Sequence, residues 1–178
     1  GNCTASGGAG DCNIGDASNA GEATIQGLEA LFTYDHALNS AMTLPVGITY
    51  TYTDATFDTT FEDDGVWGDV QKGDKLPNLA PHQVQLRMGV AHVSGFSADM
   101  NVNYYSETCS TAACGANEEI DAYSIVDIAG RYQINSQTRV YATVENVFNS
   151  EDVVARAPKN GARAQKPLSM LMGVAYNF

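Results

Sequence analysis

The sequence predicts an all-β protein, an antiparallel transmembrane β-barrel to which this chain contributes about seven strands. Three observations support this fold class. Apolar and polar residues alternate along several segments, these segments are long, and short connections between them alternate with long ones. Strands of globular proteins have about 5–6 residues, whereas about 9–11 tilted residues cross a bilayer. Outer-membrane barrels have short turns on one side of the membrane and long loops on the other.

The alternation is clearest in two segments, residues 83–93 and 96–106, which a tight Ser94-Gly95 turn connects. An apolar residue occupies every second position of both segments, so one face of this hairpin is predicted to be apolar. That face comprises Val84, Leu86, Met88, Val90, Phe96, Ala98, Met100, Val102 and Tyr104.

The remaining strands follow the same pattern of two-residue periodicity. We predict them at residues 22–35, 43–57, 123–133, 138–149 and 168–178. Short turns are expected at residues 36–41 and at Asn135-Ser136. The long polar connections are residues 58–81, 107–122 and 150–167.

About seven strands do not close a bacterial barrel, which has an even number of strands from about eight upward. An open edge in lipid would leave backbone groups unpaired. We therefore expect the partner strands to come from elsewhere, or one strand to precede Glu22, although the Gly-rich opening argues against a strand there. The first residues contain no starting Met and no signal peptide, so we expect a fragment or a processed product.

Composition narrows the function. The net charge is −12 with nine Lys and Arg, and these form no basic stripe, which argues against binding to nucleic acid. No run of eighteen apolar residues predicts a membrane-spanning helix. The motifs of nucleophilic hydrolases, zinc proteases and P-loop enzymes are absent, so we do not expect an enzyme.

The four cysteines form two local pairs, Cys3 with Cys12 and Cys109 with Cys114, both within polar stretches. Such pairs suit two small disulfides in an oxidising compartment. A zinc site is the alternative, but no C-x-x-C motif is present and no His lies near either pair. If the chain ends in the periplasm, both pairs lie outside the cell.

Several motifs occur in an order that resembles the end of a TonB-dependent outer-membrane receptor. They are ATIQGLEA at 23–30, KLPNLAPHQ at 75–83, VENVFN at 144–149, ARAQKP at 162–167 and MGVAYNF at 172–178. The terminal Tyr176 and Phe178 are similar to the signal that the barrel assembly machinery reads. The chain departs from the family pattern at Leu168, where the family usually has Arg.

The resemblance implies that residues 1–178 are the C-terminal part of the receptor barrel, about the last seven strands of a 22-stranded barrel in the bacterial outer membrane. The plug domain and TonB box would lie outside this chain. The implied partners are the rest of the receptor, TonB, and outer-membrane lipid and lipopolysaccharide. The implied function is active import of a ferric chelate, and residues 155–163 look most like the ferric-citrate branch.

Two alternatives to iron import stay open. One is a TonB-dependent receptor for another cargo, such as a glycan or cobalamin. A glycan receptor should have several aromatic residues in the lumen and loops, and Trp67 is the main one that the sequence suggests. The other is a passive or structural barrel.

Arginines are the first candidates for contact with an anionic chelate, since guanidinium binds carboxylates with two hydrogen bonds. Arg87 should point into the lumen, where an ion pair with a neighbouring carboxylate or the plug is the alternative. Arg156, Lys159 and Arg163 gather in one loop and would either capture the chelate or pair with acidic loops.

The remaining candidates are uncharged or acidic. His82 would contact ligand near the outer rim or be solvated there, and Trp67 would stack on ligand or pack within its loop. No cofactor is expected, although an acidic loop offers carboxylates for Ca²⁺ without matching the EF-hand spacing. This loop contains Asp58, Glu62, Asp63, Asp64 and Asp69, and solvation of its carboxylates is the alternative.

Overall fold

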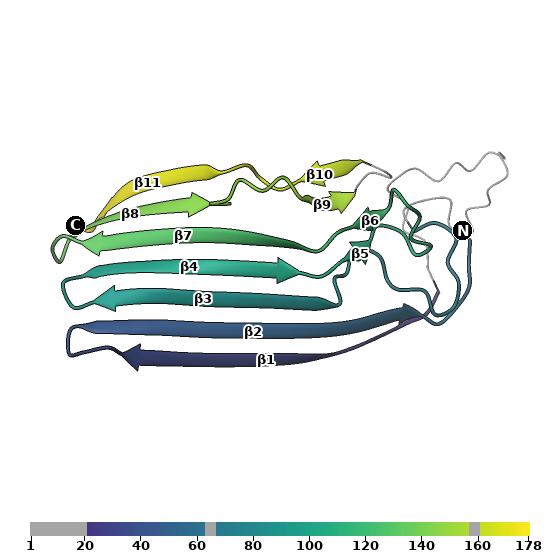
Figure 1. The fold of residues 1–178 in the computed structure, drawn as a ribbon, viewed down its shortest axis with the longest axis horizontal. Helices are drawn as coiled ribbons and strands as arrows, with labels where there is room; N and C mark the ends of the chain where they lie inside the picture. Colours follow the sequence, from purple (N-terminus) through teal and green to yellow (C-terminus); the bar gives the residue numbers. More distant parts are fainter. Residues whose placement is uncertain (1–20, 63–66, 157–160) are drawn as a thin grey trace.

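Seven long strands form one antiparallel sheet in the computed structural model, which describes residues 21–62, 67–156 and 161–178. In chain order and in space the strands follow one another as a meander (Figure 1). They are β1 (Ala23–Ala37), β2 (Met42–Phe57), β3 (His82–His92), β4 (Phe96–Tyr105), β7 (Tyr123–Gln133), β8 (Thr138–Glu145) and β11 (Ser169–Tyr176). The predicted all-β antiparallel fold is therefore confirmed.

Two small hairpins lie within connections that the sequence predicted to be loops throughout. The hairpin of β5 (Thr108–Cys109) and β6 (Glu119–Ile120) lies between β4 and β7. The hairpin of β9 (Val153–Arg156) and β10 (Ala162–Ala164) lies between β8 and β11. Strands this short are paired by their local contacts and show no alternation of their own.

Strand β8 ends at Glu145, four residues before the predicted end at Asn149. Asn146 and Asn149 both have φ near +50°, the left-handed conformation that Asn tolerates better than most residues. A strand cannot continue through such residues, so the chain leaves the sheet there.

The connections separate the sheet into a turn end and a loop end (Figure 1). At the turn end, Asn39 Oδ1 accepts a hydrogen bond from the amide of Ala41, and Asn135 Oδ1 accepts from the amides of Gln137 and Thr138. Gly95 has a φ of 89° in the turn between β3 and β4. The long connections all leave from the loop end, as predicted.

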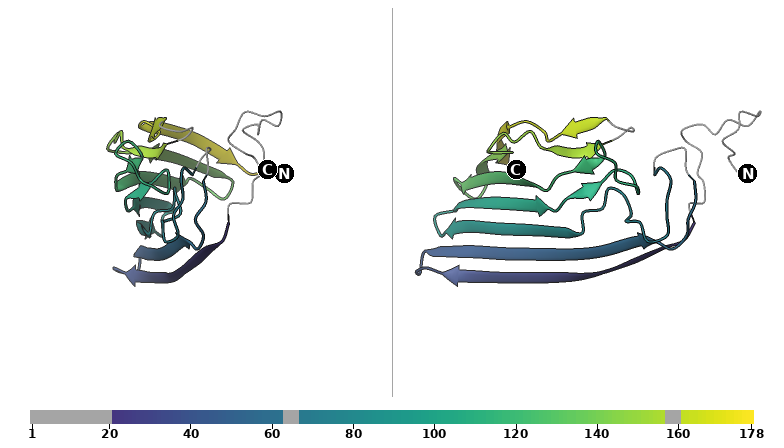
Figure 2. Two further views of the ribbon diagram at one scale, coloured as in Figure 1. Left: turned by 90° about the vertical axis from the view of Figure 1, so that its right-hand side faces the viewer. Right: turned by 45° about the vertical axis from the view of Figure 1, so that its right-hand side comes forward.

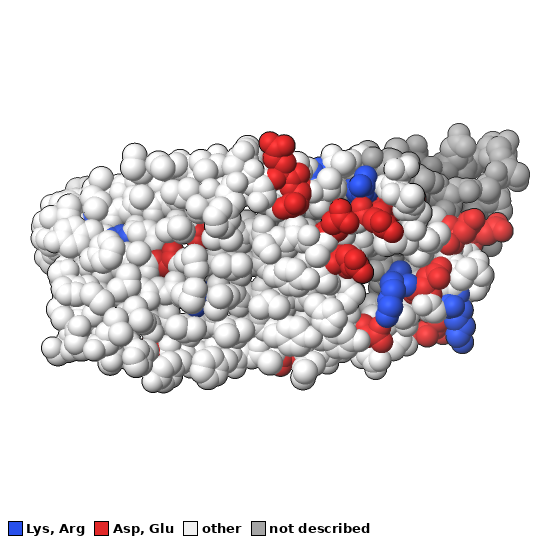
Figure 3. All heavy atoms as spheres, in the orientation of Figure 1, with Lys and Arg blue, Asp and Glu red and all other residues white. Residues whose placement is uncertain are grey.

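The register places apolar residues on one face of the sheet from β1 to β11. Leu28 pairs with Tyr52, Leu86 with Val102, and Met172 with Ala142, and paired residues of neighbouring strands lie on the same face. This apolar face is exposed in large part. On the face that Figure 3 shows, charged side chains gather toward the loop end, and most of the strand length there carries uncharged residues.

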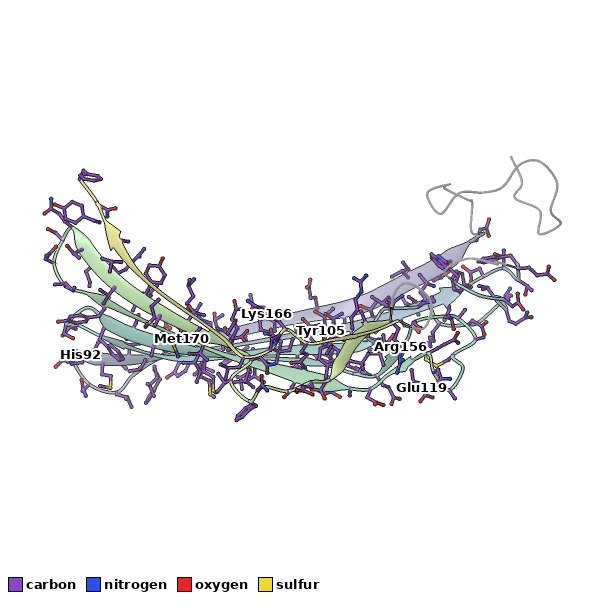
Figure 4. The ribbon with its side chains drawn as sticks, turned by 90° about the horizontal axis from the view of Figure 1, so that it is seen from above. His92, Tyr105, Glu119, Arg156, Lys166 and Met170 are labelled. Atoms are coloured by element: carbon purple, nitrogen blue, oxygen red, sulfur yellow. A yellow bond between two sulfur atoms is a disulfide. The ribbon has the colours of Figure 1, made fainter. Side chains whose placement is uncertain are left out.

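The sheet is curved rather than flat, as Figures 2 and 4 show. Within the described residues, β1 and β11 each pair with only one strand of the sheet. The described residues contain no helix with the length and hydropathy needed to span a membrane. The curvature and the exposed apolar face are those of a section of a β-barrel wall.

Candidate functional site

The polar face of the sheet carries a ladder of hydrogen-bonded side chains on β3, β4 and β7. Gln85 donates to Asn103 at 3.1 Å, and the Nε of Arg131 donates to the Ser97 hydroxyl at 2.7 Å. These cross-strand bonds hold polar groups in fixed positions, and the Ser97 side chain is buried there. The polar face therefore presents hydrogen-bonding side chains that neighbouring strands hold in place.

Arg87 lies on this face, as predicted, and forms an ion pair with Asp99 of β4. Its Nη2 and Nε atoms lie 2.8 and 3.2 Å from Asp99 Oδ1. The ion pair is the alternative that the sequence left open for Arg87. The Arg87 side chain is 56% exposed and the Asp99 side chain 18% exposed, so the guanidinium is still accessible in the ion pair. Contact between Arg87 and a chelate stays a prediction.

A stacked tyrosine pair lies on the same face near the loop end. Tyr105 and Tyr123 are paired across β4 and β7, with ring centroids 5.0 Å apart and ring planes inclined by 26°. Neither phenol oxygen has a hydrogen-bond partner among the described residues. The sequence does not indicate this pair, because β4 and β7 are separated by the 107–122 connection and their register becomes evident only in the structure.

His82 lies on the opposite, apolar face. It pairs with Tyr52, and its Nδ1 atom lies 2.9 Å from the Tyr50 hydroxyl. Its ring is stacked with the Tyr50 ring and tilted against the Tyr52 ring. The His82 side chain is therefore part of an aromatic cluster on the apolar face, away from the polar face.

Trp67 packs within its own loop against the end of β2. Its ring meets the buried Phe57 ring at 5.2 Å, and Phe57 also contacts Phe61. Phe61 and the fully buried Val70 exchange two backbone hydrogen bonds. These contacts match loop packing, while stacking of Trp67 on a ligand stays a prediction.

Connections 58–81 and 107–122 are docked onto each other and onto the sheet. The amide of Ala112 donates to the Trp67 carbonyl, and the amide of Asn78 donates to the Cys109 carbonyl. Lys75 hydrogen-bonds to Asp54 of β2, which raises the pKa of Lys75. The two connections therefore form one layer at the loop end of the sheet.

The predicted disulfide between Cys109 and Cys114 is present and links the end of β5 to the connection that leads to β6, with the two Cα atoms 5.4 Å apart. Cys3 and Cys12 lie outside the described residues. The disulfide therefore closes a short loop inside a hairpin that contains only two residues in each strand.

Of the predicted basic cluster, Arg156 lies on β9 and its Nε atom donates to the Glu119 carbonyl of β6 at 2.7 Å (Figure 4). This bond docks connection 150–167 onto the β5–β6 hairpin. Arg163 is exposed on β10 and has no ion pair with a described residue. Lys159 lies outside the described residues.

The acidic loop is only partly described, because Asp63 and Asp64 lie outside the described residues. Asp58 accepts a hydrogen bond from the Thr24 hydroxyl at 2.7 Å. The described residues contain no cluster of three or more His, Cys, Asp or Glu suited to a metal ion. Calcium binding by this loop stays a prediction, and so does the assembly signal of Tyr176 and Phe178, whose rings contact each other at 5.2 Å.

Comparison with family models gives one match, described as TonB dependent receptor-like, beta-barrel, over residues 2–147. No curated protein matches the chain.

Solved structures share the fold. The ferric-catecholate import receptor Fiu from E. coli K12 is 20% identical with a TM-score of 0.62, and the siderophore receptor PiuA from Acinetobacter baumannii is 15% identical with a TM-score of 0.65. FpvA from P. aeruginosa, solved with bound pyoverdines, is 16% identical with a TM-score of 0.61. Each match covers 88% of this chain but only 21%, 22% and 20% of those chains. The chain thus spans about a fifth of their length.

Proposed function

Since the chain belongs to the TonB-dependent receptor β-barrel family, we propose that it forms part of the wall of an outer-membrane receptor that imports a ferric chelate. The observation that carries the proposal is the division of the sheet into an exposed apolar face and a polar face with a hydrogen-bonded ladder. In a barrel of this family the apolar face contacts lipid and the polar face lines the lumen.

The loop end would then face the outside of the cell and the turn end the periplasm. This orientation places the Cys109–Cys114 disulfide in an oxidising environment, where such bonds persist. The other strands, the plug domain and the contact with TonB would be supplied by the rest of the receptor and by TonB itself. Lipid and lipopolysaccharide would surround the apolar face.

Within this function, ferric citrate is the finer assignment that we propose. Connection 150–167 supports it, because its basic residues outnumber its acidic ones, whereas the other two long connections are acidic. Arg163 is exposed and Arg87 is oriented by Asp99, so both offer guanidinium groups to a polycarboxylate. Arg156 supports chelate binding indirectly, because its guanidinium donates a hydrogen bond to the Glu119 carbonyl and thereby positions connection 150–167.

A receptor for a neutral, ring-bearing cargo such as a glycan is the second candidate. The stacked Tyr105–Tyr123 pair favours it, because aromatic faces and free hydroxyls suit sugar rings, and the neutral Gln85–Asn103 amide pair lies on the same face. His82 enters neither proposal, since its ring lies with Tyr50 and Tyr52 on the apolar face.

Uptake by iron-starved cells that make the complete receptor tests the proposal. We expect accumulation of radiolabelled iron supplied as ferric citrate, and loss of accumulation when TonB is deleted. Ferric hydroxamate and ferric catecholate chelates test the chelate class in parallel. Uptake of a labelled oligosaccharide with no ferric chelate would support the second candidate, and uptake that persists without TonB would contradict both.

A further inference from the structure

A small recess opens on the polar face where β7, the end of β8 and the segment before β11 meet. Its volume is about 150 Å³, and it is lined by Ile125, Asp127, Glu145, Asn146, Gln165 and Lys166. Sites for drug-sized ligands have about 300–1,000 Å³, so this recess fits a group of side-chain size rather than a whole chelate.

The recess contains more hydrogen-bond acceptors than donors. Glu145 accepts through Oε2 from Lys166 and from the Ser169 hydroxyl, and Asp127 accepts through Oδ1 from the Asn146 amide. The second oxygen of each carboxylate has no hydrogen bond with a described residue. Lys166 is the one cation in the lining, so the two carboxylates leave a negative charge.

Gln165 provides an independent sign that a donor is missing. Its side chain is buried, with 7% exposure. Its amide nitrogen donates to the Ser124 carbonyl and to the Asp152 carboxylate, both acceptors, which fixes the orientation of the amide group. Its Oε1 atom is buried without any partner among the described residues. Buried carbonyl oxygens in proteins are nearly always hydrogen-bonded.

We infer that this recess binds a cationic hydrogen-bond donor, a guanidinium or ammonium group that enters from the polar face. Such a group balances the excess carboxylate charge and offers several N–H donors to an acceptor-rich site. A metal ion is not favoured, because no cluster of three metal-ligating acids, His or Cys occurs in the described part of the chain. The inference rests on the proposed lumen position of the polar face, but not on the identity of the cargo.

Two different molecules could supply this cationic group. One is an Arg or Lys of a receptor segment outside this chain, and the other is a basic group of the cargo. A receptor side chain would occupy the recess in the cargo-free receptor and would therefore affect the stability of that state. A basic group of the cargo would occupy the recess only in the complex and would therefore affect the affinity for cargo.

The test uses the complete receptor, purified from outer membranes, with Asp127→Asn as the variant. The side-chain oxygen of the substituted residue can still accept a hydrogen bond from the backbone amide of Asn146. Asp127 has no ion pair with a described residue that the substitution would break. Asp121→Asn, which neutralises an exposed carboxylate next to β6, is the matched control for charge.

Two quantities are measured. The first is the unfolding temperature of the cargo-free receptor, which should fall by several degrees in Asp127→Asn if the cation belongs to the receptor. The second is the affinity for a derivative of the ferric chelate that the wild-type receptor transports, carrying a free ammonium group, relative to the N-acetylated form of that derivative. This ratio should fall about tenfold if the cation comes from cargo, since a tenfold change is about 1.4 kcal/mol.

Either effect, without a similar effect in Asp121→Asn, supports the inference. Equal unfolding temperatures and equal affinity ratios in wild type, Asp127→Asn and Asp121→Asn would overturn it. Failure of the proposed function looks different. No ferric chelate would then be transported by the wild-type receptor, whether or not Asp127→Asn lowers its unfolding temperature.

Discussion

Asp99 Oδ1 accepts hydrogen bonds from both Nη2 and Nε of Arg87, and the same oxygen fills the space beside Gly89 on the neighbouring strand. Arg87 and Asp99 are diagonal neighbours, because the residue directly opposite Asp99 in the register is Gly89, two positions after Arg87. A Cβ atom at Gly89 would lie 2.8 Å from this oxygen and 3.0 Å from the Ala98 carbonyl oxygen. A glycine therefore allows the carboxylate to lie over β3 and orient the arginine.

Gly89→Ala should break this arrangement. The new methyl group meets both the carboxylate and a backbone oxygen, and we expect a loss of about 1–3 kcal/mol of barrel stability, the usual cost of overpacking. The midpoint of heat denaturation of the complete receptor measures it. Gly130→Ala is the control, since its Cβ would have only an ordinary contact of 3.9 Å with the Ser97 carbonyl. Equal midpoints for the two variants would show that the Gly89 space is not required.

Arg87→Ala should weaken the binding of an anionic chelate about tenfold or more, because a hydrogen bond to a charged group contributes about 1.5–3 kcal/mol. The substitution also leaves Asp99 unpaired. The double variant Arg87→Ala with Asp99→Asn separates the two effects, as in a double-mutant cycle. Affinity is measured by equilibrium binding of labelled ferric citrate. Recovery of wild-type affinity in the double variant would mean that Arg87 only neutralises Asp99.

Asn146 should be required for the position of connection 150–167. Its Nδ2 atom donates to the carbonyls of Ser150 and Lys166, and its Oδ1 atom accepts from the Ser150 amide. Asn146→Ala loses these three bonds, at about 1 kcal/mol each, and also strains the positive φ. We expect faster proteolysis of residues 150–167 in the folded receptor.

Asn146→Gly is the matched comparison, because Gly tolerates the positive φ but lacks the side chain. It should be cleaved faster than wild type but unfold at a higher temperature than Asn146→Ala. Wild-type cleavage rates in both variants would contradict the role of Asn146 in holding the connection.

The orientation of the wall can be tested with the thiol that Cys109→Ser releases at Cys114. In intact cells this thiol should react with a membrane-impermeant maleimide, because the β5–β6 hairpin is proposed to face outward. Ser136→Cys, in the turn between β7 and β8, should react only after the outer membrane is permeabilised. The opposite labelling pattern would reverse the proposed orientation.

The seven long strands were predictable because their side chains alternate between two environments that differ in polarity. The apolar residues Ala98, Met100 and Val102, with Asp99 and Asn101 between them, give such a pattern without any tertiary information. The turns were predictable as well, because Gly95 and Asn135 have local roles that their residue types favour. Contacts between distant segments were not predictable in this way.

His82 shows how a small error in a boundary conceals the role of a residue. The predicted strand began at Gln83, one residue after His82, which was expected near the outer rim, whereas the structure has His82 as the first residue of β3, opposite Tyr52. The alternation then assigns its ring to the apolar face. The Tyr105–Tyr123 pair and the recess beside Asp127 depend on strand register and on the return of connection 150–167, which local sequence does not encode.

The most direct test of the account measures which solvent each face meets, in the complete receptor reconstituted in lipid bilayers. Spin labels are attached to Met172→Cys on the apolar face and to Asn101→Cys on the polar face, and collision rates are recorded with oxygen and with a water-soluble nickel chelate. If the sheet is a barrel wall between lipid and lumen, the label at position 172 collides mainly with oxygen and the label at position 101 mainly with the nickel chelate. Equal exposure of both labels to the nickel chelate, or the reverse pattern, would contradict a barrel wall with lipid on one side and a lumen on the other.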